Sequence, residues 1–306
     1  MTEERPSKFS LIFAYAMIYI IWGSTYLGIR FSVQTIPPLL SGGLRFLMAG
    51  LLLTGFRLLR GVGMPTLAGW KSAYKAGLLP FVISYGLITT AEVVVPSSVA
   101  ALLVALEPLW FCLIGWFFFG GEKPQLRHYL GIVFGIAGTY FIVTGDPNAA
   151  VSLDLSYLFW IGMLLLSSLS WVGGAFISKN PNIHGDPMMS SGMQMLCGGG
   201  TLMAVQYAVS AFTGNYPSYS SFSTVSVIAL IYLITFGSIV AYTSFLWLMR
   251  VEPASRIATH AFVNPVIAVF LGWLLGGEHI HKNMLIATPL VVLSVIMLIW
   301  EPKKKF

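Results

Sequence analysis

Long apolar stretches separated by short polar breaks run through the whole sequence. A membrane-crossing helix needs about 20 mostly apolar residues, and ten stretches of that kind occur. They centre on residues 9–29, 38–57, 72–90, 97–119, 128–145, 155–177, 188–212, 225–248, 254–276 and 283–300. The polar segments between them are too short for a soluble domain. The pattern predicts an all-α membrane protein with ten transmembrane helices, the first a retained helix and not a cleaved signal peptide.

The composition agrees with lipid as the main solvent of the chain. Of the 306 residues, 57% are hydrophobic and 9% are charged, whereas a soluble domain carries about a quarter charged residues. This composition excludes a disordered chain and a basic nucleic-acid-binding domain. With Cys112 and Cys197 as its two cysteines, the chain is not a disulfide scaffold either.

The positions of the positive charges indicate how the helices are oriented. With the N-terminus in the cytoplasm, 14 of the 17 Lys and Arg residues fall on the cytoplasmic side, Arg30 and Lys282 fall outside, and Arg45 lies within span 2. This is the asymmetry that the positive-inside rule describes. The net charge of +6 therefore reports orientation and does not imply an acidic partner. We expect a multi-pass protein of the cytoplasmic (inner) membrane of a bacterium, with both termini cytoplasmic.

The two halves of the chain resemble each other. Offsets of 149 and 157 residues superimpose several prolines, glycines and aromatic residues, among them Trp22 on Trp171, Tyr85 on Tyr242 and Pro108 on Pro265. Because each half would contain five helices, an odd number, the second repeat (150–306) would be inverted relative to the first (1–149). Inverted repeats are a recurrent architecture of secondary transporters, whose substrate site lies near the midplane between the halves.

Short motifs within the spans resemble those of a known transporter family. They are Trp22-Gly-Ser-Thr-Tyr26, Arg45-Phe46, Glu107-Pro108, Asn264-Pro265 and the Gly-Gly-Glu turns at 120–122 and 276–278. Over essentially its whole length the chain is similar to the drug/metabolite transporter superfamily, and within it to the bacterial EamA-type permeases. The resemblance implies ten helices in two inverted five-helix repeats around a central cavity lined chiefly by spans 1, 3, 4, 6, 8 and 9. It also implies export of amino acids, related metabolites or toxic organic compounds.

Two ionisable side chains lie deep in the predicted spans, where charge is costly and a functional role is the first hypothesis. Arg45 is about seven residues from the external end of span 2, roughly 10 Å deep at ~1.5 Å per residue. Glu107 is about ten residues into span 4, roughly 15 Å deep. The two could form a structural ion pair that locks two helices together. Alternatively, Glu107, or the pair, faces the cavity and senses a substrate amine or a proton.

A proline follows a polar residue near the midplane in both halves. Glu107 precedes Pro108, and Asn264 precedes Pro265 at the equivalent position of the second repeat. Proline cannot donate a hydrogen bond to the carbonyl four residues back, and freed carbonyls at membrane depth are tolerated where they face a cavity or neighbouring helices. The pattern indicates either packing kinks or hinges beside a cavity, with Pro108 and Pro265 as the hinge residues.

Aromatic and small polar residues near these positions could complete a substrate site. Aromatic rings bind apolar, aromatic or cationic ligands, although each ring could equally belong to the core. His260, one turn before Asn264, could respond to pH or simply pack. The predicted substrate-binding residues are Trp22, Ser24, Thr25, Tyr26, Tyr85, Glu107, Trp171, Tyr242, His260 and Asn264. His and Cys residues do not occur at metal-ligand spacing within the spans, so we expect neither a metal nor a cofactor.

These features favour a secondary transporter over an enzyme or a pump. The sequence contains no Gly-x4-Gly-Lys phosphate-binding loop, which excludes ATP-driven pumping by this chain, and no catalytic cluster that indicates an enzyme. We expect an exporter of small organic metabolites, amino acids or related amphipathic or cationic compounds, working by alternating access, with proton coupling through Glu107 as one option. One alternative is an organophosphate or nucleotide-sugar exchanger, which a single intramembrane arginine disfavours, and another is a channel-like facilitator. The expected partners are a small-molecule substrate and the lipid bilayer, without nucleic acid, for a monomer or weak homo-oligomer.

Overall fold

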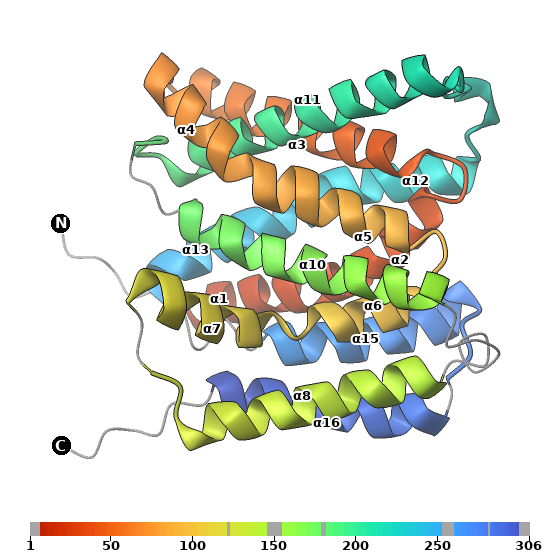
Figure 1. Cartoon of the computed structure of the whole chain (residues 1–306). Coiled ribbons are helices and arrows are strands. Elements are labelled where there is room, and N and C mark those ends of the chain that lie inside the picture. The colour runs from red at the N-terminus through yellow and green to blue at the C-terminus, as the bar shows by residue number, and fades with distance from the viewer. Residues whose placement is uncertain are drawn as a thin grey trace, which may run out of the picture.

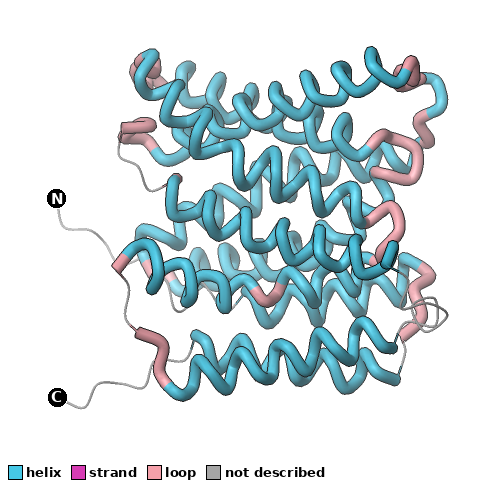
Figure 2. The backbone as a smooth tube through the Cα atoms, viewed as in Figure 1, coloured by secondary structure: helices cyan, strands magenta, loops and turns pink. Residues whose placement is uncertain are grey.

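The described part of the chain is helical throughout. The computed structural model describes residues 7–120, 123–145, 155–178, 182–252, 260–280 and 282–299. These ranges contain helices and short connections but no strand (Figure 2). The prediction of an all-α chain is confirmed for these residues. Gly121 and Glu122 of the first Gly-Gly-Glu turn lie outside them.

Helices follow one another with short connections in both halves of the chain (Figure 1). The first half comprises α1 (Lys8–Ala16), the π-helical segment η1 (Met17–Ile21), α2 (Trp22–Ser32), α3 (Pro38–Leu59), α4 (Leu67–Gly77), the π-helical segment η2 (Leu78–Ser84), α5 (Tyr85–Ala91), α6 (Ser97–Val104), α7 (Glu107–Phe119) and α8 (Leu126–Gly145). The second half comprises α10 (Leu155–Ile177), α11 (Pro187–Thr213), the 3-10 turn η3 (Tyr219–Ser221), α12 (Thr224–Tyr232), the π-helical segment η4 (Leu233–Val240), α13 (Ala241–Val251), α15 (His260–Gly276) and α16 (Lys282–Ile299).

Six helical stretches within the described ranges are long and apolar enough to cross a membrane. They are Lys8–Ser32, Pro38–Leu59, Ser97–Phe119, Leu155–Ile177, Pro187–Thr213 and Thr224–Phe245. Two shorter apolar stretches, Val263–Gly276 and Lys282–Met297, follow later in the chain. The predicted spans at 72–90 and 128–145 also fall on helix. The chain has the helical fold of a membrane protein, and the number of ten crossings stays a prediction.

A charged contact between Arg57 and Asp186 joins the end of α3 to the beginning of α11. Asp186 is the N-cap of α11 and accepts a hydrogen bond from the Met189 backbone nitrogen at 2.8 Å, which satisfies one of the free N–H groups of the first turn. The two Asp186 oxygens also accept hydrogen bonds from the Arg57 guanidinium, at 3.2 and 2.6 Å, in a bidentate pair. The contact therefore fixes these two helix ends relative to each other.

Close packing through glycine holds α3 against α11. The two helices lie side by side at one edge of the bundle, and α8 and α16 lie side by side at the opposite edge (Figure 1). A Cβ atom on Gly199 of α11 would lie 2.4 Å from the Leu47 backbone nitrogen of α3. Small residues are common at helix contacts in membranes, because van der Waals packing has to replace the hydrophobic effect there. Between α8 and α16, the Ser294 hydroxyl donates to the Gly131 carbonyl at 2.6 Å.

Regular α-helix is interrupted near the middle of several predicted spans. Three interruptions are π-helical, namely η1, η2 and η4, and π-helical turns are frequent at functional sites. In span 4, Ala105 and Leu106 separate α6 from α7 (Figure 2), and Pro108 lies in the first turn of α7. Pro265 lies inside α15 instead. The two predicted hinge prolines thus differ, since Pro108 lies in the first turn of a helix that follows a break, whereas Pro265 lies inside a continuous helix.

The packing of α3 on α11 can be tested with two neighbouring glycines of α11. We expect Gly199→Ala to destabilise the protein by about 1–3 kcal/mol, the usual cost of overpacking, because the new methyl group would press on backbone that cannot move aside. Gly200 is the matched control, since a Cβ there meets nothing within 4 Å. Gly200→Ala should be neutral or stabilising by up to about 1 kcal/mol through helix propensity. Thermal unfolding in detergent measures both, and equal unfolding temperatures would contradict the close contact.

Candidate functional site

A cavity of about 150 Å³ lies inside the bundle. Its lining comes from both halves of the chain, namely from α2, α3, η2, α5, α6, α7, α10, α11, η4, α13 and α15. A cavity of about this volume is large enough for a molecule of the size of benzene. The bundle therefore offers room for a small organic ligand between helices of both halves of the chain.

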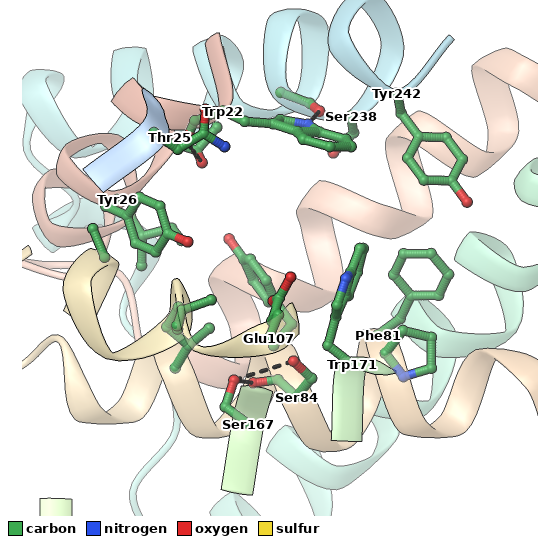
Figure 3. Close-up of a pocket in the computed structure, with 18 of the residues that line it drawn as sticks. Trp22, Thr25, Tyr26, Phe81, Ser84, Glu107, Ser167, Trp171, Ser238 and Tyr242 are labelled. Carbon is green, nitrogen blue, oxygen red and sulfur yellow. Dashed lines mark hydrogen bonds between the residues drawn. The ribbon is translucent and has the colours of Figure 1, made fainter. Parts of the chain in front are cut away.

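Most of the predicted substrate-binding residues line this one cavity. Nine of the ten do so: Trp22, Thr25, Tyr26, Tyr85, Glu107, Trp171, Tyr242, His260 and Asn264. They come from helices far apart in the sequence, and Figure 3 shows Trp22, Tyr26, Trp171 and Tyr242 around the Glu107 carboxylate. The cavity wall thus combines aromatic rings and charged groups, which suits an organic ligand with an apolar part and a charged part.

Two predicted residues lie outside the lining. The Ser24 hydroxyl donates to the Ile21 carbonyl at 2.8 Å and shares a hydrogen bond with the Tyr232 hydroxyl, so it links α2 to α12. Pro108 does not line the cavity either, although its neighbour Glu107 does. The structure therefore gives Ser24 a role in helix contact and leaves Pro108 beside the site.

Glu107 presents an unpaired carboxylate to the cavity. It lies in the first turn of α7, and its side chain projects toward the centre of the site (Figure 3). Within the described ranges, no hydrogen bond or ion pair holds this carboxylate. The first turn of a helix favours negative charge, because the backbone N–H groups there point toward it. Glu107 is therefore placed to accept hydrogen bonds from a ligand.

Arg45 is bound to hydroxyl groups and aromatic rings, not to Glu107. Its Nε donates to Ser238 Oγ at 2.8 Å, and its Nη1 donates to the Tyr85 hydroxyl at 3.0 Å. The guanidinium carbon lies 4.9 Å from the Tyr85 ring centroid and 5.3 Å from that of Phe46, within reach of a cation–π interaction. The ion pair considered between Arg45 and Glu107 is not formed in this structure, since hydroxyl groups and π faces hold the guanidinium elsewhere in the cavity wall.

A glycine in η4 makes room for this arginine. A Cβ atom on Gly237 would lie 2.9 Å from Arg45 Nη2 and 3.1 Å from a Thr25 methyl group. The Gly237 carbonyl accepts a hydrogen bond from Trp22 Nε1 at 3.3 Å. The π-helical turn thus brings its backbone against two cavity residues, one cationic and one aromatic.

The His260 and Asn264 side chains close the part of the cavity that α15 forms. The His260 ring lies edge-on to Trp22, with the ring centroids 5.2 Å apart. With its amide nitrogen facing two carbonyls, Asn264 donates to His260 O at 3.2 Å and to Tyr19 O at 3.1 Å. The bond to the Tyr19 carbonyl joins α15 to η1, so Asn264 has a structural role next to the cavity.

Sequence reasoning missed several lining residues that share one feature. Phe81, Ser167 and Ser238 line the cavity, and each precedes a predicted aromatic lining residue by four positions. Side chains four residues apart lie on the same face of a helix, so this spacing could have identified them. Ser84 is a further addition: its hydroxyl lies 3.1 Å from that of Ser167, which donates to the Ser84 carbonyl at 2.8 Å (Figure 3).

Comparisons with known proteins agree with this picture. The model of the EamA-like transporter family matches residues 9–144 and again residues 158–300. The chain is 35% identical over 295 residues to the Escherichia coli K12 protein named uncharacterized inner membrane transporter YedA, which covers 94% of this chain and 89% of the relative. It is 24% identical over 299 residues to a transporter named YvbV of Bacillus subtilis, across 97% of this chain and 93% of that protein. A solved crystal structure shares the fold, with a TM-score of 0.65 at 17% identity over 94% of this chain and 96% of that one.

The family model covers most of the chain, and the comparisons point to a transporter and not to an enzyme. The helical bundle and its internal cavity are in keeping with that assignment. The chain belongs to the EamA-like transporter family.

Proposed function

We propose that the chain is a secondary transporter that exports small organic metabolites across the cytoplasmic (inner) membrane of a bacterium. These metabolites would be amino acids or related amphipathic or cationic compounds. The observation that carries this proposal is the composition of the cavity wall, in which the Glu107 carboxylate and the Arg45 guanidinium stand among aromatic rings. The family resemblance and the name of the relative YedA, an inner membrane transporter, support both the location in the membrane and the role in transport.

The two charged groups suit a ligand that carries both charges. Glu107 can accept charge-assisted hydrogen bonds from an ammonium group, and Arg45 can donate to a carboxylate. Arg45 uses Nε and Nη1 for Ser238 and Tyr85, and its Nη2 donates to none of the described groups. The rings of Trp22 and Trp171 would contact the apolar part of the ligand. Such a wall favours a zwitterionic amino acid or an amphipathic amine.

The size and charge of the cavity disfavour the alternative of a nucleotide-sugar or organophosphate exchanger. A volume of about 150 Å³ suits a ligand with roughly the dimensions of one aromatic ring, which is far smaller than a nucleotide sugar. Among the described lining residues Arg45 is the single Lys or Arg, whereas recognition of phosphate normally uses several cations.

We further propose that transport proceeds by alternating access of two inverted halves, 1–149 and 150–306, with ten helices and both termini in the cytoplasm. The twofold match of the family model supports the duplication. The pairing of α3 with α11 and of α8 with α16 supports a pseudo-twofold relation, because these helices occupy equivalent places in the two repeats. The break before Pro108 and the kink expected at Pro265 would be the hinges.

The ligand class can be tested on the purified protein. We expect amino acids or organic amines to raise its unfolding temperature in a stabilisation screen, since a ligand that binds the folded state alone stabilises it. The ligands found should then exchange in counterflow with proteoliposomes, in a saturable manner. A response to sugar phosphates alone would contradict the proposal, and non-saturable flux without counterflow would indicate a channel.

Replacement of Glu107 tests the amine site. Glu107→Gln should weaken binding of amine-containing ligands about tenfold or more, because a hydrogen bond to a charged group contributes about 1.5–3 kcal/mol. Glu107→Asp keeps the charge and should retain most of the binding. If Glu107 also carries a coupling proton, the pH dependence of transport in proteoliposomes flattens in Glu107→Gln. Unchanged binding and unchanged pH dependence in this variant would remove Glu107 from both roles.

Replacement of Arg45 tests the carboxylate site by a different pattern of loss. Arg45→Gln should weaken the binding of an amino acid about tenfold or more but leave the binding of the corresponding decarboxylated amine almost unchanged. Glu107→Gln should weaken the binding of both compounds. Calorimetric titration of the two ligands against the two variants gives the comparison. Equal losses of both ligands in Arg45→Gln would show that Arg45 supports the shape of the cavity and does not bind the ligand.

A further inference from the structure

A second charged cluster lies outside the cavity, where the ends of three cavity-lining helices meet. The Glu278 carboxylate accepts hydrogen bonds from Ser97 N at 2.9 Å, Ser97 Oγ at 2.7 Å and Ser98 N at 3.1 Å, and also from the Ser98 hydroxyl. Arg30 Nη1 lies 3.0 Å from Glu278 Oε1. These contacts join the beginning of α6 and the last turn of α2 to the turn after α15. On the orientation proposed above, the cluster lies at the external end of the bundle.

Glu278 is fully satisfied as an anion in this arrangement. Its side chain is 5% exposed, and that of Arg30 is 31% exposed. A Cβ atom on Gly272 would lie 2.5 Å from Glu278 Oε2, so the glycine leaves room for the carboxylate. Because the carboxylate already receives four hydrogen bonds from the serines and one from the arginine, the positive charge of Arg30 is committed to Glu278.

Glu92 precedes Ser97 and Ser98 by a few residues in the sequence, and its carboxyl group lacks hydrogen bonds within the described part of the chain. It is 2% exposed, and neither carboxyl oxygen has a hydrogen-bond partner in the described part of the chain. It caps the C-terminal end of α5, where its backbone nitrogen donates to Ile88 O at 2.9 Å and where the helix carries partial negative charge. An ionised carboxylate buried in this way costs several kcal/mol. The neutral, protonated form of Glu92 is the one that fits this structure.

The charged groups that act on Glu92 come from three neighbouring elements. They are Arg30 on α2, Arg45 on α3 and Glu278 after α15. Burial raises the pKa of the Glu92 carboxyl well above its usual range and the Glu278 carboxylate raises it further, while the two arginines lower it. The titratable His279 imidazole next to Glu278 is exposed.

We propose that Glu92 is a proton-binding site linked to the contact of Arg30 with Glu278. Glu92 holds its proton while the contact is closed. When the contact opens, the Glu92 O–H bond breaks, the proton passes to external water and the electron pair stays on the carboxylate. The physical reason is competition for the positive charge of Arg30, which acts electrostatically on Glu92 and pairs with Glu278 and can neutralise one of the two carboxylates at a time. Resting on the transport cycle proposed above, this gives an exporter a site at its external end that takes up a proton when the contact closes and releases it when the contact opens.

The first test follows stability with pH in the full-length protein in detergent. A group whose pKa is raised on folding contributes its full stabilisation below the pKa of the unfolded chain, about 4.3 for Glu, and this is lost as the pH rises through the folded-state pKa. Glu92→Gln cannot ionise, so its unfolding temperature relative to the wild type should rise with pH. His279→Gln is the matched control and should keep the wild-type pH dependence. A difference between Glu92→Gln and wild type that is the same at every pH, or a dependence on sodium in place of pH, would overturn the proposal.

The second test detects the proton directly and requires no substrate. The infrared carbonyl band of protonated carboxylic acids should be present in the wild type near neutral pH, and Glu92→Gln should lose a component that Glu107→Gln retains. In Glu278→Gln, where Arg30 is released, the same component should weaken because Arg30 can then pair with Glu92. A spectrum that is identical in the wild type and Glu92→Gln, or unaltered in Glu278→Gln, would overturn the proposal. Failure of counterflow with intact infrared changes would instead count against the proposed transport function alone.

Discussion

Lipid offers no hydrogen-bond partners, so each polar group in a membrane bundle must be satisfied inside the protein. The structure meets this requirement at almost every buried polar side chain near the cavity. Arg45 donates to Ser238 and Tyr85, and Glu278 receives hydrogen bonds from two serines and an arginine. Against that background, a carboxylate without a partner is informative. Glu107 faces a cavity, which implies a ligand, and Glu92 is enclosed, which implies a proton.

The same requirement explains how the helices can pack closely and still rearrange. Some hydroxyls near the cavity bond within their own helix, as Thr25 does to Trp22 O at 2.7 Å, while Ser84 and Ser167 bond to each other across two helices. Glycines such as Gly237 allow the backbone to lie against large side chains. The π-helical segments and the break at Ala105–Leu106 place irregular backbone around the cavity. Irregular backbone at membrane depth is tolerated where it borders protein or a cavity. Alternating access requires helices to bend at such places.

The amino-acid sequence predicts the helices well and their rotation about their own axes poorly. Apolar windows mark where helices occur because the thickness of the bilayer sets their length. Counting residues along the helices predicts similar depths in the membrane for Arg45 and Glu107, but the count does not say which way either side chain points. The structure turns Arg45 toward Tyr85, and it turns Ser24 toward Tyr232. Glu92 follows the predicted span at 72–90, and tertiary packing that the sequence does not show buries it to 2% exposure.

The central claim is that an unpaired carboxylate in an aromatic cavity recognises a ligand amine. The most direct measurement compares, by calorimetry on the unmodified protein, an amino acid that stabilises it with the hydroxy acid that differs only in having a hydroxyl in place of the amino group. Because the hydroxy acid cannot make the charge-assisted hydrogen bond to Glu107, it should bind about tenfold or more weakly than the amino acid. Equal affinity for the two compounds would contradict the account.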